Sequence, residues 1–249
     1  MNYKVDLTGL VDTDRMIEVK RIDPAAWLDR RGYWFVRRAA DVTLSLAALA
    51  VLAVPMAVIA LAVTLDSPGP VFYRQERVGK DRKPFQLVKF RSMRIDAEKA
   101  GDQWGKEHDP RVTRMWHIMR ACRLDELPQF WGVVKGDLSL VGPRLERAVF
   151  YDAFEKYIPG FKQRLMVTPG ITGLAQVNGG YDLKPAEKIQ YDVEYIKHQS
   201  LGMDMAILLK TVITVLLGPN VWADSKPKSE FCPTYVGFQP VAVRTGRGF

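Results

Sequence analysis

The feature that most constrains this chain is an uncharged run of 24 residues, from 42 to 65. A helix rises 1.5 Å per residue, so this run would measure about 36 Å, which is enough to cross a hydrocarbon core of about 30 Å. The run begins too far into the chain, and is too long, to be the apolar part of a signal peptide. We therefore expect residues 42–65 to form a membrane segment.

Pro55 lies inside this run, where it removes a backbone hydrogen bond and costs about 3 kcal/mol unless the helix bends. Basic residues flank both ends of the run: Arg30, Arg31, Arg37 and Arg38 precede it, and Arg74, Arg77, Lys80, Arg82 and Lys83 follow it. Positive flanks tend to stay on the cytoplasmic side, so both ends belong on one face. We expect a re-entrant helix broken at Pro55, and the alternative is a proline-kinked helix that spans the membrane.

The overall charge indicates an anionic partner. Lys and Arg outnumber Asp and Glu by 36 to 28, a net charge of +8. Nucleic acid, nucleotide phosphates and an anionic membrane surface all fit that sign, but recognised nucleic-acid motifs are missing. The two cysteines, Cys122 and Cys232, form no CxxC pattern, which excludes a thiolate zinc site and fits a reducing compartment. The three histidines lack metal-ligand spacing.

An Asp125-Glu126 pair stands just ahead of Pro128, and proline is favoured in the first turn of a helix, where amides have no partner. We expect both carboxylates at or near a helix N-terminus, where the dipole would keep Asp125 ionised. Adjacent helical residues point in different directions, so we expect the two carboxylates to have different chemical roles. An ionised Asp can attack phosphorus, and a Glu can hold Mg²⁺. The alternative is a helix cap with surface acids.

Basic side chains that suit phosphate recognition lie near this pair. Residues 71–73 and 85–90 are expected to be two strands around a turn. Lys89 and Arg91 would share one face of the second strand, as a phosphate clamp or as a solvated face. The candidates for phosphate contacts are Lys89, Arg91, Arg120, Arg123 and Arg144. Any of them can instead pair with an acid or a lipid headgroup.

The C-terminal half contains a glycine-rich stretch and two helical patterns. Residues 168–180 lack GxGxxG and GxxxxGK[ST], so neither a dinucleotide fold nor a P-loop is supported, although the stretch can line a nucleotide pocket. Residues 185–198 predict an amphipathic helix bearing Asp192. Residues 204–217 are mostly apolar but too short to span, so they lie either in the membrane interface or in the core.

Five motifs occur in a fixed order: KFRSM at 89–93, DPRVT at 109–113, LDELPQ at 124–129, KGDLSLVGPR at 135–144 and PGITG at 169–173. Together with the apolar run, they make residues 33–222 resemble the bacterial sugar transferases of the monotopic phosphoglycosyl transferase family. Members of that family are polyprenyl-phosphate hexose-1-phosphate transferases. Because the motifs are ordered, the resemblance is far more specific than any one of them alone.

The resemblance implies transfer of a sugar 1-phosphate from a UDP-sugar to undecaprenyl phosphate, with release of UMP. It would be the first membrane step in synthesis of an exopolysaccharide, O-antigen or glycoprotein. Asp125 would form a covalent phosphosugar intermediate, and Glu126 would act with it in holding Mg²⁺. Pro143 and Arg144 would contact the nucleotide, and we assign Gln176 of the glycine-rich stretch to the same pocket.

The expected fold is a mainly α, α/β membrane-anchored monotopic domain with a small β-hairpin and amphipathic interfacial helices. We divide the chain into a polar extension (1–32), the sugar transferase domain (33–222) and a tail (223–249). The resemblance places the domain on the cytoplasmic face of the bacterial inner membrane. Its partners would be a UDP-sugar, undecaprenyl phosphate and membrane lipid, with room for a homodimer and no nucleic acid. The alternatives are a non-catalytic membrane scaffold and a membrane-tethered nucleic-acid binder.

Overall fold

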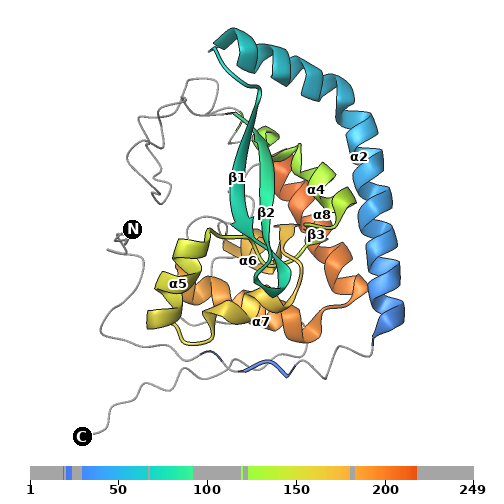
Figure 1. Cartoon of the computed structure of the whole chain (residues 1–249). Coiled ribbons are helices and arrows are strands. Elements are labelled where there is room, and N and C mark those ends of the chain that lie inside the picture. Colours follow the sequence, from blue (N-terminus) through green and yellow to red (C-terminus); the bar gives the residue numbers. More distant parts are fainter. Residues whose placement is uncertain are drawn as a thin grey trace, which may run out of the picture.

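The computed structural model describes residues 19, 21–23, 30–66, 68–91, 119, 123–179 and 183–217. Helices dominate these residues and the strands are short (Figure 1). In chain order the elements are α2 (Arg31–Asp66), β1 (Phe72–Val78), the 3-10 helix η1 (Lys80–Arg82), β2 (Pro84–Phe90), η2 (Leu124–Glu126), α4 (Gln129–Lys135), β3 (Ser139–Val141), α5 (Ala148–Tyr157), η3 (Phe161–Met166), β4 (Gly170–Thr172), α6 (Leu174–Gly179), α7 (Pro185–His198) and α8 (Leu201–Leu217). The mainly helical architecture with a small hairpin confirms the expected fold class, and the membrane topology stays a prediction.

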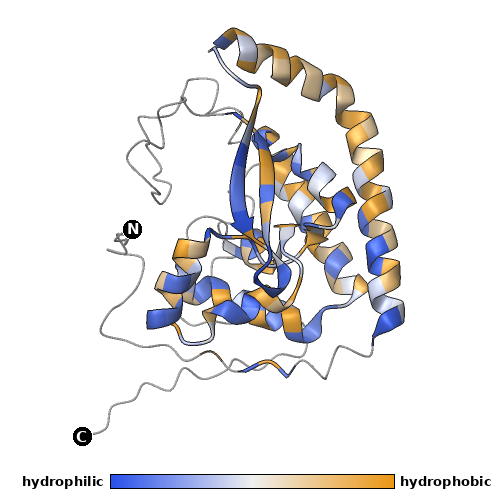
Figure 2. Cartoon of the chain, viewed as in Figure 1, coloured by the Kyte–Doolittle hydropathy of each residue, from blue (hydrophilic) through white to orange (hydrophobic). Residues whose placement is uncertain are grey.

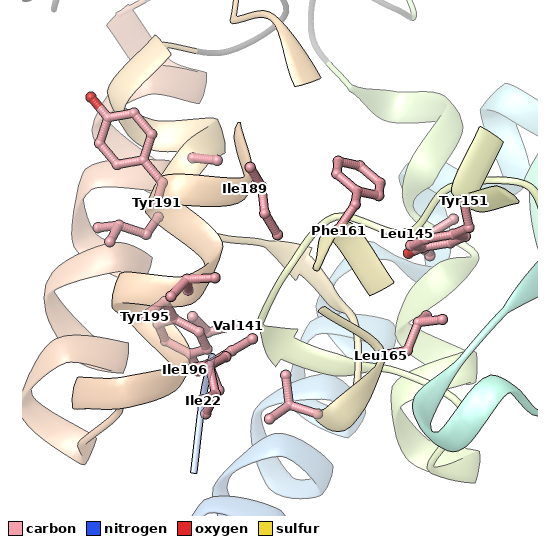
Figure 3. Packing of buried hydrophobic residues seen from close by; sticks show 14 of the residues in the cluster. Ile22, Val141, Leu145, Tyr151, Phe161, Leu165, Ile189, Tyr191, Tyr195 and Ile196 are labelled. Carbon is pink, nitrogen blue, oxygen red and sulfur yellow. The ribbon is translucent and has the colours of Figure 1, made fainter. Parts of the chain in front are cut away.

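The main hydrophobic core lies between α7, α5, η3 and β3. Ile189 and Ile196 of α7 and Phe154 of α5 are fully buried. Phe154 and Phe161 pack edge to face, with ring centroids 5.2 Å apart. Figure 3 shows Val141 of β3 beside Ile196. The helix α7 has the bounds that its sequence predicted, because its apolar residues recur with the helical period and face this core.

Two residues of the N-terminal extension contribute to this core. Val19 and Ile22 are both buried. The Val19 amide donates to the carbonyl oxygen of Pro159 at 3.2 Å, and the Ile22 amide donates to Oε1 of Gln163 at 2.6 Å. The extension, to which the sequence assigned no chemistry, therefore packs against η3 and the residues just before it. The tail, 223–249, lies outside the described residues.

The strands β3 and β4 form a parallel pair that brings two distant motifs together. Ser139 lies opposite Gly170, and an isolated bridge from Arg144 to Gly170 extends the pairing. A Cβ on Gly170 would meet the backbone of Gly142 directly, so only glycine fits there. The glycine-rich stretch thus allows the two backbones to approach closely.

The strands β1 and β2 form the predicted antiparallel hairpin. Phe72 lies opposite Phe90 at its open end, and the two rings stack with centroids 5.3 Å apart. The Gly79 amide donates to the carbonyl oxygen of Lys83 at 2.8 Å and closes the turn. β1 is longer than the predicted 71–73, because alternating exposed and half-buried residues continue the strand up to this turn.

The helix α2 runs without interruption through Pro55. Figure 1 shows it bending over in its second half. Large apolar residues are exposed there: Val51, Val54, Val58, Leu61 and Leu65. Figure 2 shows this half as mostly hydrophobic, and α2 is long and apolar enough to cross a membrane. The helix α2 therefore continues through Pro55, as either a re-entrant or a spanning bent helix would, because one missing hydrogen bond does not end a helix whose other turns stay bonded. Re-entry stays a prediction.

The first half of α2 buries a polar stripe against the rest of the protein. Arg37, Asp41 and Ser45 are spaced four residues apart on one helical face, and all three are buried. Asp41 accepts hydrogen bonds from Oγ of Ser139 at 2.7 Å and from the Leu140 amide at 3.1 Å. Arg37 donates to the same Oγ at 2.9 Å. Arg37 was expected to be a flanking charge beside the membrane, but it instead fastens α2 to β3.

The helix α8 has one face in the core and one face exposed. Ile207 is buried, and Asp204 accepts hydrogen bonds from the hydroxyl groups of Tyr195 at 2.7 Å and Tyr33 at 3.1 Å. The exposed apolar residues of α8 are Leu201, Met205, Leu209, Val212, Ile213 and Val215. Core packing is therefore confirmed for one face, and contact of the other face with a membrane stays a prediction.

We predict that Gly170→Ala lowers the free energy of unfolding by about 3 kcal/mol or more, because the new Cβ would meet backbone atoms that cannot move aside. Denaturant unfolding of the detergent-purified protein measures this change. Gly202→Ala is the matched control, since its Cβ meets nothing within 4 Å and alanine is the better helix former. Equal stability of the two variants would contradict the close approach of β3 and β4.

Candidate active site

The Asp125-Glu126 pair lies in the short 3-10 turn η2, directly ahead of α4. Pro128 immediately precedes the first residue of α4, so the predicted position near a helix N-terminus is confirmed. Asp125 is 4% exposed and Glu126 is 7% exposed, which excludes surface acids that merely cap a helix. Arg123, just before the turn, has a φ of 54°. Such a conformation is uncommon for a residue other than glycine and is often found at functional sites.

Glu126 binds two cations that come from different parts of the chain. Its Oε1 accepts a hydrogen bond from Nη2 of Arg144 at 2.6 Å and lies 3.4 Å from Nζ of Lys89. Arg144 follows β3, whereas Lys89 lies near the end of β2. Although burial acts in the opposite direction, Arg144, Lys89 and then Arg123 hold the pKa of Glu126 well below its usual range. The carboxylate of Glu126 is therefore ionised at neutral pH.

The pKa of Asp125 is shifted in the opposite direction to that of Glu126. Burial first, and the charge of Glu126 second, raise the pKa of Asp125 to about 6. Among the described residues, no side chain donates a hydrogen bond to its carboxylate. The sequence predicted that the helix dipole would keep Asp125 ionised. Burial outweighs the dipole and raises the pKa, so Asp125 is still ionised at neutral pH but becomes protonated below about pH 6. Neighbouring carboxyl groups with separated pKa values are typical of sites where two acids have different roles.

The backbone of Arg144 is hydrogen-bonded by one member of a buried ion pair, Arg164–Asp192, which was not predicted as part of the site. Nη2 of Arg164 donates to the Arg144 carbonyl oxygen at 2.7 Å. Nε of Arg164 lies 2.7 Å from Oδ2 of Asp192 on α7, and the two side chains are almost inaccessible. The one sequence signal for this pair was Asp192, a carboxylate within an otherwise amphipathic helix. Nothing local pointed to Arg164 as its partner.

The remaining predicted phosphate ligands divide into three groups. Lys89, Arg123 and Arg144 surround Glu126. Arg91 is buried and donates to the carbonyl oxygens of Pro68 at 2.9 Å and Val63 at 3.4 Å, so it ties the hairpin to the end of α2. Arg120 lies outside the described residues. Phosphate binding by all five stays a prediction, and Arg91 in addition has a structural role through these two hydrogen bonds.

The predicted nucleotide ligands Pro143 and Gln176 lie along the β3–β4 pair. The Pro143 carbonyl oxygen accepts from the Gly170 amide at 3.0 Å. Nε2 of Gln176 donates to the Ile171 carbonyl oxygen at 2.9 Å. Oε1 of Gln176 is buried and has no hydrogen-bond partner within the described part of the chain. Gln176 lies on α6, directly after β4, and Arg144 follows β3, so the parallel pair brings the two segments together. Gln176 keeps a buried acceptor.

The oxygen atoms of Asp125 and Glu126 suit Mg²⁺, a hard cation that prefers oxygen ligands. No cluster of three or more His, Cys, Asp or Glu side chains occurs among the described residues. Protein-bound Mg²⁺ commonly keeps several waters and uses one or two carboxylates plus substrate phosphates, so two carboxylates are enough. Oε1 of Glu126 is occupied by cations.

We predict opposite pH effects for the neutral variants of the two acids. The raised pKa of Asp125 means that its ionised form destabilises the fold above about pH 6. Asp125→Asn should therefore raise the free energy of unfolding at about pH 8 by on the order of 2–3 kcal/mol, and this gain should vanish as pH falls toward about 4. The lowered pKa of Glu126 means that its ionised form instead stabilises the fold. Glu126→Gln should lower stability at neutral pH, and its deficit should shrink in acid. Denaturant unfolding from about pH 8 down to about pH 2 measures both effects, because the loss caused by Glu126→Gln shrinks only below the ordinary glutamate pKa of 4.5. A shared sign would contradict the two assignments.

Comparison with known proteins identifies several similar chains. A UDP-N-acetylgalactosamine-undecaprenyl-phosphate N-acetylgalactosaminephosphotransferase of Aeromonas hydrophila is 41% identical over 215 residues, which cover 85% of this chain and 50% of that protein. A putative undecaprenyl-phosphate N-acetylgalactosaminyl 1-phosphate transferase of Bacillus subtilis is 50% identical over 133 residues, or 53% of this chain and 74% of that protein. A UDP-glucose:undecaprenyl-phosphate glucose-1-phosphate transferase of Xanthomonas campestris is 42% identical over 196 residues, or 76% of this chain and 40% of that protein. This chain therefore spans half or less of the length of two of these relatives.

A family match covers most of the chain. Residues 32–218 match the family described as bacterial sugar transferase. This stretch contains the helix α2, the hairpin, the Asp125-Glu126 turn and the β3–β4 pair. The chain belongs to the bacterial sugar transferase family.

Proposed function

We propose that this protein transfers a sugar 1-phosphate from a UDP-sugar to undecaprenyl phosphate and releases UMP, through a covalent phosphosugar intermediate on Asp125. Membership of the family supports this class of reaction. The three relatives described above are named as transferases that act with undecaprenyl phosphate. Their names include both N-acetylgalactosamine and glucose, so the donor class is a UDP-hexose or a UDP-N-acetylhexosamine.

The observation that carries the proposal is the pair of adjacent buried carboxyl groups with opposite pKa shifts. Glu126 stays ionised and binds Arg144 and Lys89, which are suited to hold phosphate groups. Asp125 is buried beside them without a cationic hydrogen-bond partner among the described residues, and it is ionised at neutral pH. A carboxylate in that state is a competent nucleophile toward an electrophilic phosphorus.

The reaction would proceed in two displacements at one phosphorus atom. A carboxylate oxygen of Asp125 attacks the β-phosphorus of the donor, and the bond from that phosphorus to the bridging oxygen breaks, so UMP leaves with the bonding electrons. An oxygen of undecaprenyl phosphate then attacks the same phosphorus, and the bond to Asp125 breaks. The products are a polyprenyl diphosphate sugar and the regenerated carboxylate.

The surrounding residues would mainly position substrates and neutralise charge, which is most of what phosphoryl transfer requires. Arg144 and Lys89 offset the charge on the phosphoryl oxygens, and Glu126 fixes where those two cations lie. Mg²⁺ bound by Glu126 and Asp125 would supply further neutralisation of the donor phosphates. Gln176 offers its buried Oε1 to a donor group of the nucleotide.

Access to the lipid substrate follows from the position of the hairpin. Phe90, next to Lys89, packs in one cluster with Val63 near the end of α2. If the exposed apolar half of α2 lies in lipid, this end of the hairpin is at headgroup depth, where the phosphate of the acceptor lies. The exposed apolar face of α8 suits the membrane interface. We propose that α2 is re-entrant and that the site faces the cytoplasm at the inner membrane.

We predict that purified protein with Mg²⁺, a UDP-sugar and a polyprenyl phosphate releases UMP, and that Asp125→Asn abolishes release while the fold is retained. The rate of the unmodified enzyme should fall to half near pH 6, because Asp125 must be ionised. Intact-mass spectrometry of donor-treated enzyme should find one added sugar phosphate on the peptide that contains Asp125. Equal turnover by the Asn variant would overturn the assignment and favour a non-catalytic scaffold. A panel of UDP-sugars identifies the donor.

We predict that the two ends of α2 lie on the same side of the membrane. In a background with Cys122→Ser and Cys232→Ser, the exposed positions Gly32 and Pro70 are each replaced by Cys. Both should be protected from a membrane-impermeant thiol reagent in intact cells and labelled after permeabilisation. Labelling of only one of them in intact cells would mean that α2 crosses the membrane.

A further inference from the structure

A second group of basic side chains lies close enough to Arg144 to interact with it electrostatically. It consists of Arg77 on β1, Arg147 just before α5 and Lys188 on α7, and we call it the Arg77 cluster. The Glu146 carboxylate is among the groups that act most strongly on Arg77 and Lys188. Arg144 also acts electrostatically on both of these cations, so the cluster and the Asp125-Glu126 site share this arginine.

The buried guanidinium of Arg77 has only part of its hydrogen-bonding capacity satisfied. Its Nη2 donates to Oε1 of Gln75 at 2.6 Å. Its Nε is buried and has no hydrogen-bond partner within the residues that the structure describes. A buried guanidinium donor without a partner is costly, and an incoming acceptor would remove that cost.

The charges around Arg77 point to an anionic acceptor. Asp192, a buried carboxylate on α7, already forms an ion pair with Arg164. Burial first, then the charges of Arg147 and Arg144, lower the pKa of Arg77 to about 10 against the opposing effect of Glu146. Burial likewise lowers the pKa of Lys188, with contributions from Arg164 and Arg144. Cations that depress each other's charge in this way gain stability when an anion binds between them.

We propose that the Arg77 cluster is a second phosphate subsite, which binds the α-phosphate of the nucleotide donor and the nucleoside monophosphate that is released. The proposal rests on the proposed function. Lys89 and Arg144 would hold the phosphate that is attacked, and the Arg77 cluster would hold the phosphate that leaves. Negative charge grows on the leaving group as the bridging bond breaks, so cations placed there stabilise the transition state.

The position of the cluster along the hairpin favours the soluble donor over the lipid acceptor. Phe72 and Phe90 are at the end of the hairpin that adjoins α2. Arg77 is five residues farther along β1, roughly 17 Å away at the usual rise of a strand. Figure 1 shows the hairpin extending from the end of α2 toward α6 and α7. On the proposed topology, Arg77 thus lies farther from the membrane end of the hairpin than Lys89 does, in the direction from which a water-soluble nucleotide arrives.

Substrate kinetics test the subsite. Arg77→Gln should raise KM for the UDP-sugar and the inhibition constant of UMP together, each by about tenfold or more, and leave KM for the polyprenyl phosphate unchanged. Arg77→Lys, which keeps the charge, should restore part of the affinity. The matched control is Arg74→Gln, because Arg74 is on the same strand but exposed. Unchanged constants for donor and UMP, or a rise confined to the acceptor, would overturn the assignment.

Binding measured without turnover separates this proposal from the proposed function. Calorimetric titration of UMP into Asp125→Asn protein should give an affinity that the added Arg77→Gln change weakens by the same factor. If Arg77→Gln does not fold, Arg147→Gln tests the same cluster, since Arg147 is only half buried. If replacement of Arg77 or Arg147 leaves the affinity for UMP unchanged, the subsite proposal is wrong even if the enzyme is active. If the unmodified protein shows no turnover, the proposed function is wrong even if UMP binds.

Discussion

The contact on which the site depends is the ion pair between Glu126 and Arg144. It joins the turn ahead of α4 to the segment that follows β3, and Lys89 of β2 completes it. The pair is largely buried, so removal of either partner would leave an uncompensated charge, which is far more costly than loss of a surface ion pair. Arg164, itself bound to Asp192, holds the Arg144 carbonyl oxygen. The acid, the arginine and their support thus form one continuous polar network.

This network explains why two neighbouring carboxyl groups behave differently. Glu126 takes the cationic hydrogen bonds, so its ionised form is stabilised despite burial. Asp125 bears the cost of burial and also the repulsion from Glu126, so its pKa rises. A partly destabilised carboxylate is a better nucleophile than one fixed by strong hydrogen bonds. The stability of Glu126 and the reactivity proposed for Asp125 therefore have one cause.

The sequence predicted those parts of the fold that local signals determine. The hairpin, the bounds of α7 and the position of the Asp125-Glu126 pair before a helix follow from turn residues, hydrophobic period and Pro128. Partners that are far apart in the chain could not be predicted in this way. Arg91 donates hydrogen bonds to backbone carbonyl groups in and just after the last turn of α2. Arg164 forms an ion pair with Asp192. The pKa of Asp125 was also missed, because the dipole is visible in sequence and the depth of burial is not.

The polar stripe on α2 connects the membrane segment to the chemistry. Arg37 donates to the Val141 carbonyl oxygen at 2.5 Å, and Asp41 accepts from the Leu140 amide, so α2 fixes β3 at consecutive residues. Arg144 is only three residues after Val141, so these bonds restrict where its backbone lies. Buried polar networks that are well satisfied specify one arrangement of their elements. On the proposed topology, the helix that sets the depth of the protein in the bilayer also sets the position of Arg144, and through it that of the Asp125-Glu126 pair relative to the lipid phosphate.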